Sequence, residues 1–227
     1  MKKLVFIVFL MSACLAVCRA QTDSVAYGAD FVLKEGIYLS YTDFRKNNPV
    51  PKDAIQSKED KTQLDFISKT ISDNKEITIV YNGNENKLET SKLWGYCQNS
   101  TLYLNYEGKF YRVPVFGNIS HFLGTIEVYN YNNYYGGYGM GMYGMGGMGM
   151  YGSNGMYVKQ REMRQFIFDF YSGDIMDYTL SNVEMLISRD MKLYEEFMQY
   201  KKKKRRELMM MYVRKYNASH PVYFPAK

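Results

Sequence analysis

The order of the periodic segments constrains the fold of this chain most: short aromatic and β-branched runs come first, and helical repeats come last. Turn residues separate the runs, which is the pattern of short strands. The runs are GIYLSY (36–41), EITIVY (76–81), KLWGYC (92–97), TLYLNY (101–106), KFYRVPVF (109–116), FLGTIEVY (122–129) and RQFIFDF (164–170). We therefore expect about 6–8 short strands in an antiparallel meander sheet.

Short turns join several of these runs into hairpins. QNS (98–100) and EGK (107–109) each separate two runs, so residues 94–116 are predicted to form a three-stranded meander. SGD (172–174) makes another tight turn. Residues 43–46 are expected to form one helical turn, which the prolines of NNPVP end.

From Ser181 the pattern becomes helical. Ser181 and Glu184 have the spacing of a capping box, and Asp190 can cap a second helix that runs to about Tyr216 before Pro221 ends it. The apolar residues of this second helix recur at helical intervals and form one broad stripe. The chain is therefore predicted to be an α+β protein, with an antiparallel sheet followed by two C-terminal helices.

Residues 134–157 form a low-complexity insertion between two predicted strands. Apart from Ser153 and Asn154, the insertion contains only Gly, Tyr and Met. With ten glycines and no Leu, Ile, Val or Phe, it cannot bury enough apolar surface to offset the entropy lost on ordering. We expect a disordered insertion, because loops of this length are usually either functional or disordered.

Residues 1–20 have the layout of a secretory signal peptide. Two lysines precede the apolar run LVFIVFL (4–10), and small residues then lead to VCRA, which predicts cleavage between Ala20 and Gln21. The apolar run is too short for a membrane span, which needs roughly 20 residues. We therefore expect an exported chain without an integral span. A rival interpretation treats MSAC as a lipoprotein box with Cys14 as the lipidated residue.

Loss of the leader would change both the cysteine content and the charge. Cys97 would be the one cysteine left, so a core rather than an internal disulfide must hold the remaining roughly 200 residues together. The net charge would fall from +6 to +3. Between Arg189 and Lys215, ten basic residues face four acidic ones. We therefore divide the chain into a β-rich part (21–190) and a basic amphipathic helix with an aromatic tail (191–227), packed on the same domain.

Six methionines in the insertion offer thioether ligands, which suit Cu(I). They are Met140, Met142, Met145, Met148, Met150 and Met156. Their spacing is similar to that of methionine clusters in copper-handling proteins outside the cytoplasm. Two other interpretations stay open, namely a Tyr/Met contact surface and a passive loop. Cu(I) or another soft metal is the one cofactor that the sequence suggests.

Six consecutive cations lie in the predicted second helix: Lys201, Lys202, Lys203, Lys204, Arg205 and Arg206. On an amphipathic helix, such a run can contact anionic lipid headgroups, lipopolysaccharide phosphates or an acidic partner protein. Nucleic acid is a poor partner for an exported chain. The alternative is a solvated helix face. Because six charges interrupt the apolar stripe, we expect this part of the helix to project beyond the sheet.

No group of residues predicts a catalytic site. Cys97 could act as a nucleophile only within hydrogen-bond reach of His121 or His220, and its place in an aromatic strand predicts burial instead. Two carboxylate pairs also lack a supporting pattern: Asp169 with Asp174, and Glu195 with Glu196. No phosphate-binding glycine loop or zinc-ligand spacing is present. We therefore predict a non-enzymatic protein and keep an uncharacterised hydrolase as a third hypothesis.

Three long stretches resemble a group of exported proteins of Bacteroidota-type bacteria that carry no assigned function. The stretches are GIYLSYTDFRKNNPV, KLWGYCQNSTLYLNYEGKFYRV and the segment from FIFDFYSGD to HPVYFP. The resemblance covers most of the chain after the leader and implies no catalytic residue, ligand or partner. DSV (23–25) also resembles a short O-glycosylation signal of such bacteria, which makes Ser24 a candidate modification site.

Together these features predict an exported protein of the periplasm, the outer-membrane surface or the exterior. Its expected role is interaction with an envelope protein or an anionic surface. Binding of Cu(I) by the insertion and hydrolysis are the alternatives.

Overall fold

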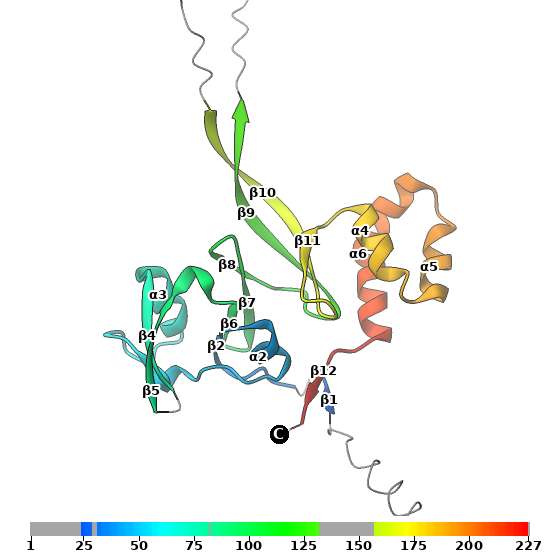
Figure 1. Cartoon of the computed structure of the whole chain (residues 1–227). Helices are drawn as coiled ribbons and strands as arrows, with labels where there is room; N and C mark the ends of the chain where they lie inside the picture. Colours follow the sequence, from blue (N-terminus) through cyan, green and yellow to red (C-terminus); the bar gives the residue numbers. More distant parts are fainter. Residues whose placement is uncertain (1–23, 29–30, 82, 132–156, 227) are drawn as a thin grey trace, which may run out of the picture.

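The structure, a computed structural model, describes residues 24–28, 31–81, 83–131 and 157–226 (Figure 1). It confirms the α+β class: the strands form small antiparallel sheets, and most of the helical residues follow them as a separate layer. The strands do not form one meander. The twelve strand segments of the described chain are divided among four sheets, each with two to four strands.

A central sheet pairs four strands in the order β2-β6-β7-β8. They are β2 (Gly36–Tyr38), β6 (Gly95–Gln98), β7 (Thr101–Tyr106) and β8 (Lys109–Arg112). Two consecutive residues with positive φ form each turn: Asn99 (50°) and Ser100 (57°), then Glu107 (53°) and Gly108 (77°). Two consecutive positive φ values give each two-residue turn a twist that matches the right-handed twist of its flanking strands. The meander predicted for residues 94–116 is confirmed as β6-β7-β8.

A second sheet has the order β3-β4-β5 and packs against a helix that the sequence analysis missed. Its elements are β3 (Ile55–Gln56), β4 (Glu76–Tyr81), β5 (Asn84–Glu89) and α3 (Phe66–Asp73). Phe66 and Ile71 of α3 are buried in one cluster with Ile77 and Ile79 of β4. Shorter elements connect the two sheets: α2 (Tyr41–Arg45), which is the predicted helical turn, and the 3-10 turns Lys52–Ala54 and Thr90–Lys92.

A long two-stranded ribbon projects from the body of the molecule (Figure 1). It consists of β9 (Ile119–Tyr131) and β10 (Tyr157–Asp169), with β11 (Ile175–Asp177) paired to the base of β10. Side chains alternate between two cores at this base: Phe166 and Phe168 belong to an aromatic cluster, and Ile167 belongs to the helical layer. Burial on both faces explains why residues 166–168 (FIF) form a continuous apolar run.

Aromatic side chains fill the space between the central sheet and the ribbon. The ring of Phe44 stacks on Trp94 with centroids 4.5 Å apart, and the ring of Phe31 stacks on Phe224 at 4.8 Å. Near the ends of the described chain, β1 (Ser24–Ala26) pairs with β12 (Tyr223–Pro225). The predicted aromatic tail therefore packs on the body, with Phe224 fully buried.

The helical layer contains three helices where the sequence predicted two. They are α4 (Leu180–Ile187), α5 (Met191–Met198) and α6 (Lys202–Ser219). Asp190 caps α5 as predicted, but α4 is capped by Thr179, whose hydroxyl accepts from the Asn182 N–H, and not by Ser181. The predicted long helix is interrupted at Lys201, which is extended. The break falls at the first residue of the basic run, so the other five charges form the first turns of α6.

Candidate functional site

Helix α6 begins inside the basic run. Lys201 precedes its first turn with φ −61° and ψ 151°, and no side chain in the described structure caps this end. A lysine cannot accept the N–H groups that the first turn leaves free. The lysines that follow also lie at the positive end of the helix dipole, where cations are unfavourable. The helix dipole therefore adds to the positive charge that the basic run concentrates at the start of α6.

Two of the six cations in this run have acidic partners. Lys204 Nζ lies 3.0 Å from Glu207 Oε2. Arg205 Nε lies 2.8 Å from Glu184 Oε1 of α4, although neither atom makes an aligned hydrogen bond, and the Arg205 side chain is only 15% exposed. Arg205 therefore joins α6 to α4. It does not belong to a solvated face, and α6 at this point packs on α4 and does not project freely.

The other four cations of the run are exposed: Lys201, Lys202, Lys203 and Arg206. None of them forms an ion pair with an acidic residue in the part of the chain that the structure describes. The run that the sequence singles out thus provides four cations that an external anion can reach.

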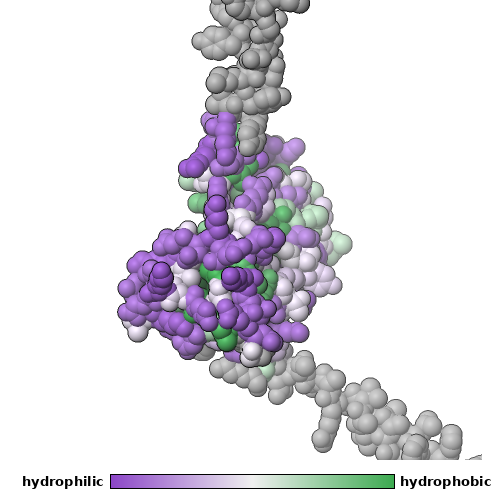
Figure 2. All heavy atoms as spheres, turned by 60° about the vertical axis from the view of Figure 1, so that its left-hand side comes forward, coloured by the Kyte–Doolittle hydropathy of each residue, from purple (hydrophilic) through white to green (hydrophobic). Residues whose placement is uncertain are grey.

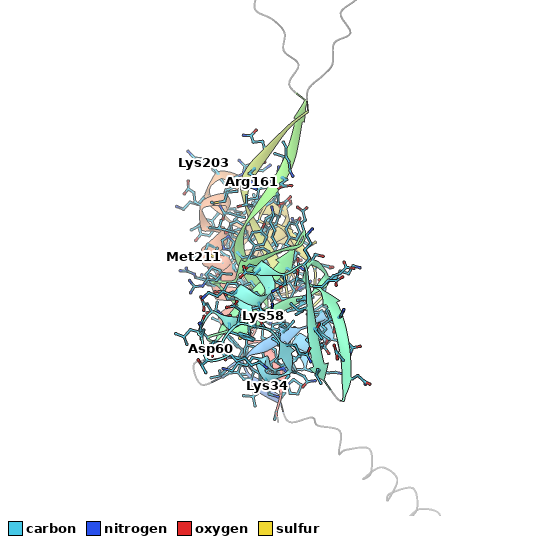
Figure 3. The ribbon with its side chains drawn as sticks, turned by 90° about the vertical axis from the view of Figure 1, so that its left-hand side faces the viewer. Lys34, Lys58, Asp60, Arg161, Lys203 and Met211 are labelled. Carbon is cyan, nitrogen blue, oxygen red and sulfur yellow. The ribbon has the colours of Figure 1, made fainter. Side chains whose placement is uncertain are left out.

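The ribbon carries a further exposed cation, Arg161 of β10. Figure 3 shows it at about the same height as Lys203, but the ribbon and the helical layer lie on different sides of the body in Figure 1. Glu127 faces Arg161 across the ribbon, but its carboxylate lies 2.6 Å from Lys159 Nζ and 3.5 Å from Lys109 Nζ. The hydrogen bond from Lys159 keeps the pKa of Glu127 below its ordinary value.

We call the four exposed cations at the start of α6 the cationic end: Lys201, Lys202, Lys203 and Arg206.

A cavity of about 690 Å³ lies away from the start of α6, between α3 and β8. Figure 2 shows this side of the molecule, where hydrophilic residues surround small hydrophobic areas. The cavity is lined by Lys75 and Asp73 as well as by the buried ring of Tyr96. None of the residues that the sequence singled out lies there, so its size alone does not connect it with a function.

The structure does not bring the cysteine and the histidines together. Cys97 is fully buried, and its thiol faces the backbone oxygen of Leu33 at 3.8 Å. Burial, with a smaller contribution from the charge of Glu35, raises the pKa of the Cys97 thiol to about 12. His121 contacts Tyr178, whereas His220 stacks on Tyr216. Cys97 is therefore a core residue, as predicted.

Asp169 has a structural role. Its carboxylate is 1% exposed and accepts two hydrogen bonds from Arg189, at 2.8 and 2.7 Å. Ser172 and the Tyr171 N–H donate to the same carboxylate. The backbone oxygen of Asp174 accepts the Asp169 N–H. The two carboxylates belong to a tight turn, in agreement with their interpretation as turn residues.

Several predicted positions lie outside the described residues. These are the six methionines from Met140 to Met156 and the cleavage site at Ala20 and Gln21, so Cu(I) binding and leader cleavage stay predictions. Ser24 is described: it is exposed and lies opposite Pro225 in the β1-β12 pair. Among the described residues, no group of three His, Cys, Asp or Glu side chains could hold a metal ion.

Fold and site together define an α+β protein whose last helix begins in a cationic end. The chain belongs to a family of unknown function, DUF6563, whose model matches residues 36–220. The matched region includes the central sheet, the ribbon and the helical layer. No curated protein and no solved structure matches the chain. In the described part of the chain, no helix is long and apolar enough to cross a membrane.

Proposed function

We propose that this protein is an exported, non-enzymatic protein of the cell envelope or exterior that attaches to an anionic surface through its cationic end. The surface would be built of lipid headgroups or lipopolysaccharide phosphates. The observation that carries the proposal is the set of four exposed cations at the start of α6, which have no acidic partner in the described structure.

The charge supports weak, reversible attachment. A basic residue near an anionic membrane contributes up to about 1 kcal/mol, so four of them contribute at most about 4 kcal/mol, equivalent to a dissociation constant no tighter than about 1 mM. Because exposed charges are screened over about 8 Å at physiological ionic strength, the attachment would weaken as salt is added.

Export is part of the proposal. The signal-peptide pattern of residues 1–20 supports it, and so does the resemblance of the chain to exported proteins. A protein delivered to the envelope in this way would meet anionic headgroups directly. An acidic envelope protein is the alternative partner for the same cationic end.

The proposal is tested by vesicle flotation with two charge-matched variants. One variant replaces the four cations of α6 with glutamine (Lys201, Lys202, Lys203 and Arg206). The other replaces four exposed lysines of the sheets and loops (Lys34, Lys46, Lys58 and Lys87). Vesicles contain phosphatidylcholine with or without phosphatidylglycerol.

We expect the wild-type protein and the sheet variant to float with anionic vesicles at low salt, and the α6 variant to stay in solution. High salt should release the bound protein, and neutral vesicles should not bind it. Equal loss in both variants would show that net charge, and not the cationic end, drives binding. Equal binding of the wild-type protein to neutral vesicles would also refute the proposal.

A further inference from the structure

A pocket of about 600 Å³ lies between the start of α4 and the first turns of α6, which lie side by side (Figure 1). Its polar lining comes from both helices and the segment before α4: Tyr178, Thr179, Ser181, Lys202, Arg205 and Arg206. Leu180 and Met209 add apolar surface. Small-molecule sites commonly enclose about 300–1,000 Å³, so the pocket is large enough for a small ligand.

Two cations in this pocket are available to a ligand. Lys202 and Arg206 are four residues apart on α6, so their side chains share one face of the helix. Both are exposed and have no ion-pair partner in the described structure. Arg205, the third cation, is already held by Glu184, which also lines the pocket. The pocket therefore carries two positive charges in excess.

Hydroxyl groups face these cations from the α4 side of the pocket. Thr179 Oγ1 accepts the Asn182 N–H at 3.3 Å and lies 3.1 Å from Ser181 Oγ. One of the two hydroxyls donates in this hydrogen bond, so the O–H of the other is left to donate to a ligand. Partial burial raises the pKa of Tyr178 to about 12, so its phenol stays protonated at neutral pH and can donate.

We propose that this pocket binds the phosphate group of a phosphate monoester through Lys202 and Arg206, with one O–H group of the Thr179–Ser181 pair as a further donor. The inference rests on the proposed attachment to an anionic surface and names the group that the cationic end selects. Lys202 supplies a point charge, and Arg206 supplies a fork that can bind two phosphate oxygens.

The number and type of donors favour a phosphate monoester over a carboxylate. A monoester carries about −1.5 to −2 charges at pH 7 and three terminal oxygens. This charge matches the two cations in excess, and three oxygens can use donors from both helices at once. A carboxylate has a single charge and two oxygens, so it would leave part of the pocket's charge unbalanced.

Two sources can supply the same chemistry: the headgroup of a membrane lipid, or a small soluble ester. Glucose 6-phosphate is the soluble probe, with glucose as its control, and binding is measured by titration calorimetry. Vesicles with phosphatidic acid are the lipid probe, compared with phosphatidylglycerol vesicles of equal surface charge, because phosphatidylglycerol carries a phosphate diester.

Two double variants remove the same charge from the same helix. Lys202→Gln with Arg206→Gln changes the pocket, whereas Lys201→Gln with Lys203→Gln changes neighbouring cations that do not line it. All four side chains are exposed, so both variants should fold, which circular dichroism verifies. We expect the pocket variant to lose at least about tenfold in affinity for the monoester and the control variant less than threefold, since charge-assisted hydrogen bonds are lost only in the former.

The outcomes separate this inference from the proposed function. A selective loss in the pocket variant supports the site: with glucose 6-phosphate it assigns a soluble ester, and with phosphatidic acid alone it assigns a lipid headgroup. Equal losses in both variants would overturn the site. The site would also be overturned if the wild-type protein neither preferred phosphatidic acid over phosphatidylglycerol nor bound glucose 6-phosphate, even if it still bound phosphatidylglycerol vesicles. In those cases the proposed function stands, whereas loss of binding to every anionic vesicle would refute both.

Discussion

Replacement of Asp169 with asparagine tests how the helical layer is fixed to the sheet. Asp169 ends β10, and its carboxylate accepts two hydrogen bonds from Arg189, in the connection between α4 and α5. Ser172 and the Tyr171 N–H donate to it as well. An asparagine keeps the shape but loses the charge, and its amide group would direct donors toward the donors of Arg189.

The expected loss of unfolding free energy follows from the unequal burial of Asp169 and Arg189. Removing one partner of a buried ion pair costs about 3–5 kcal/mol. The Asp169 side chain is 1% exposed, but that of Arg189 is 37% exposed, so water can solvate the guanidinium that is left behind. We therefore expect Asp169→Asn to lower the free energy of unfolding by about 2–3 kcal/mol.

Urea denaturation measures this change. With a slope of about 2 kcal/mol per molar urea, the midpoint should fall by about 1–1.5 M. Asp174→Asn, in the exposed part of the same turn, is the matched control and should change the unfolding free energy by less than about 0.5 kcal/mol. A cost below about 0.5 kcal/mol for Asp169→Asn, or an equal cost for the control, would refute the reasoning.

The pH dependence of this effect has a definite sign. Burial opposes ionisation of Asp169, but the hydrogen bonds from Arg189, Ser172 and Tyr171 outweigh it, so the pKa lies below its ordinary value. A carboxyl group with a lowered pKa stabilises the fold above its unfolded pKa of about 4 and loses this contribution as the pH falls further. The stability difference between wild type and Asp169→Asn should therefore be constant near neutral pH and shrink below about pH 4.

Three further predictions concern the core and the helix contact. Cys97 should resist alkylation by iodoacetamide in the native protein at pH 8 and react after denaturation, as peptide mapping can show, because its thiol is buried with a pKa near 12. Gly36→Ala should cost more than about 2 kcal/mol by urea denaturation, since φ at Gly36 is +143° and an added Cβ would lie 2.2 Å from the backbone oxygen of Val50. Arg205→Gln should cost about 1–2 kcal/mol because its ion pair with α4 is lost, whereas Lys203→Gln should cost less than about 0.5 kcal/mol; equal values would contradict the different roles of these two cations.

Local patterns predicted the parts of the fold that local chemistry determines. Each of the turns at 98–100 and 107–109 contains one residue that favours positive φ, Asn99 or Gly108, and the hairpins follow from these turns. Asp190 caps a helix because its short carboxylate reaches the Leu193 N–H. The division of the strands into four sheets was not predictable, because pairs such as β2 with β6 depend on contacts between residues far apart in the sequence.

The candidate site was predictable only in part. The basic run is visible in the sequence, but the break at Lys201 and the inward position of Arg205 depend on how α6 packs against α4. A continuous helix would have placed all six cations on one projecting segment. The pocket between the two helices has no local signal at all, since Thr179 and Ser181 are more than 20 positions away from Arg206 in the sequence.

Amide hydrogen exchange with and without anionic vesicles tests the central claim most directly. The first-turn N–H groups of Lys202, Lys203 and Lys204 have no carbonyl partner within the helix, and no side chain of the described residues caps them. We expect them to exchange rapidly in the free protein and more slowly when phosphatidylglycerol vesicles are bound, while residues of β5 and α3 are unchanged. Protection confined to another surface, or none at the start of α6 despite binding, would contradict attachment through the cationic end.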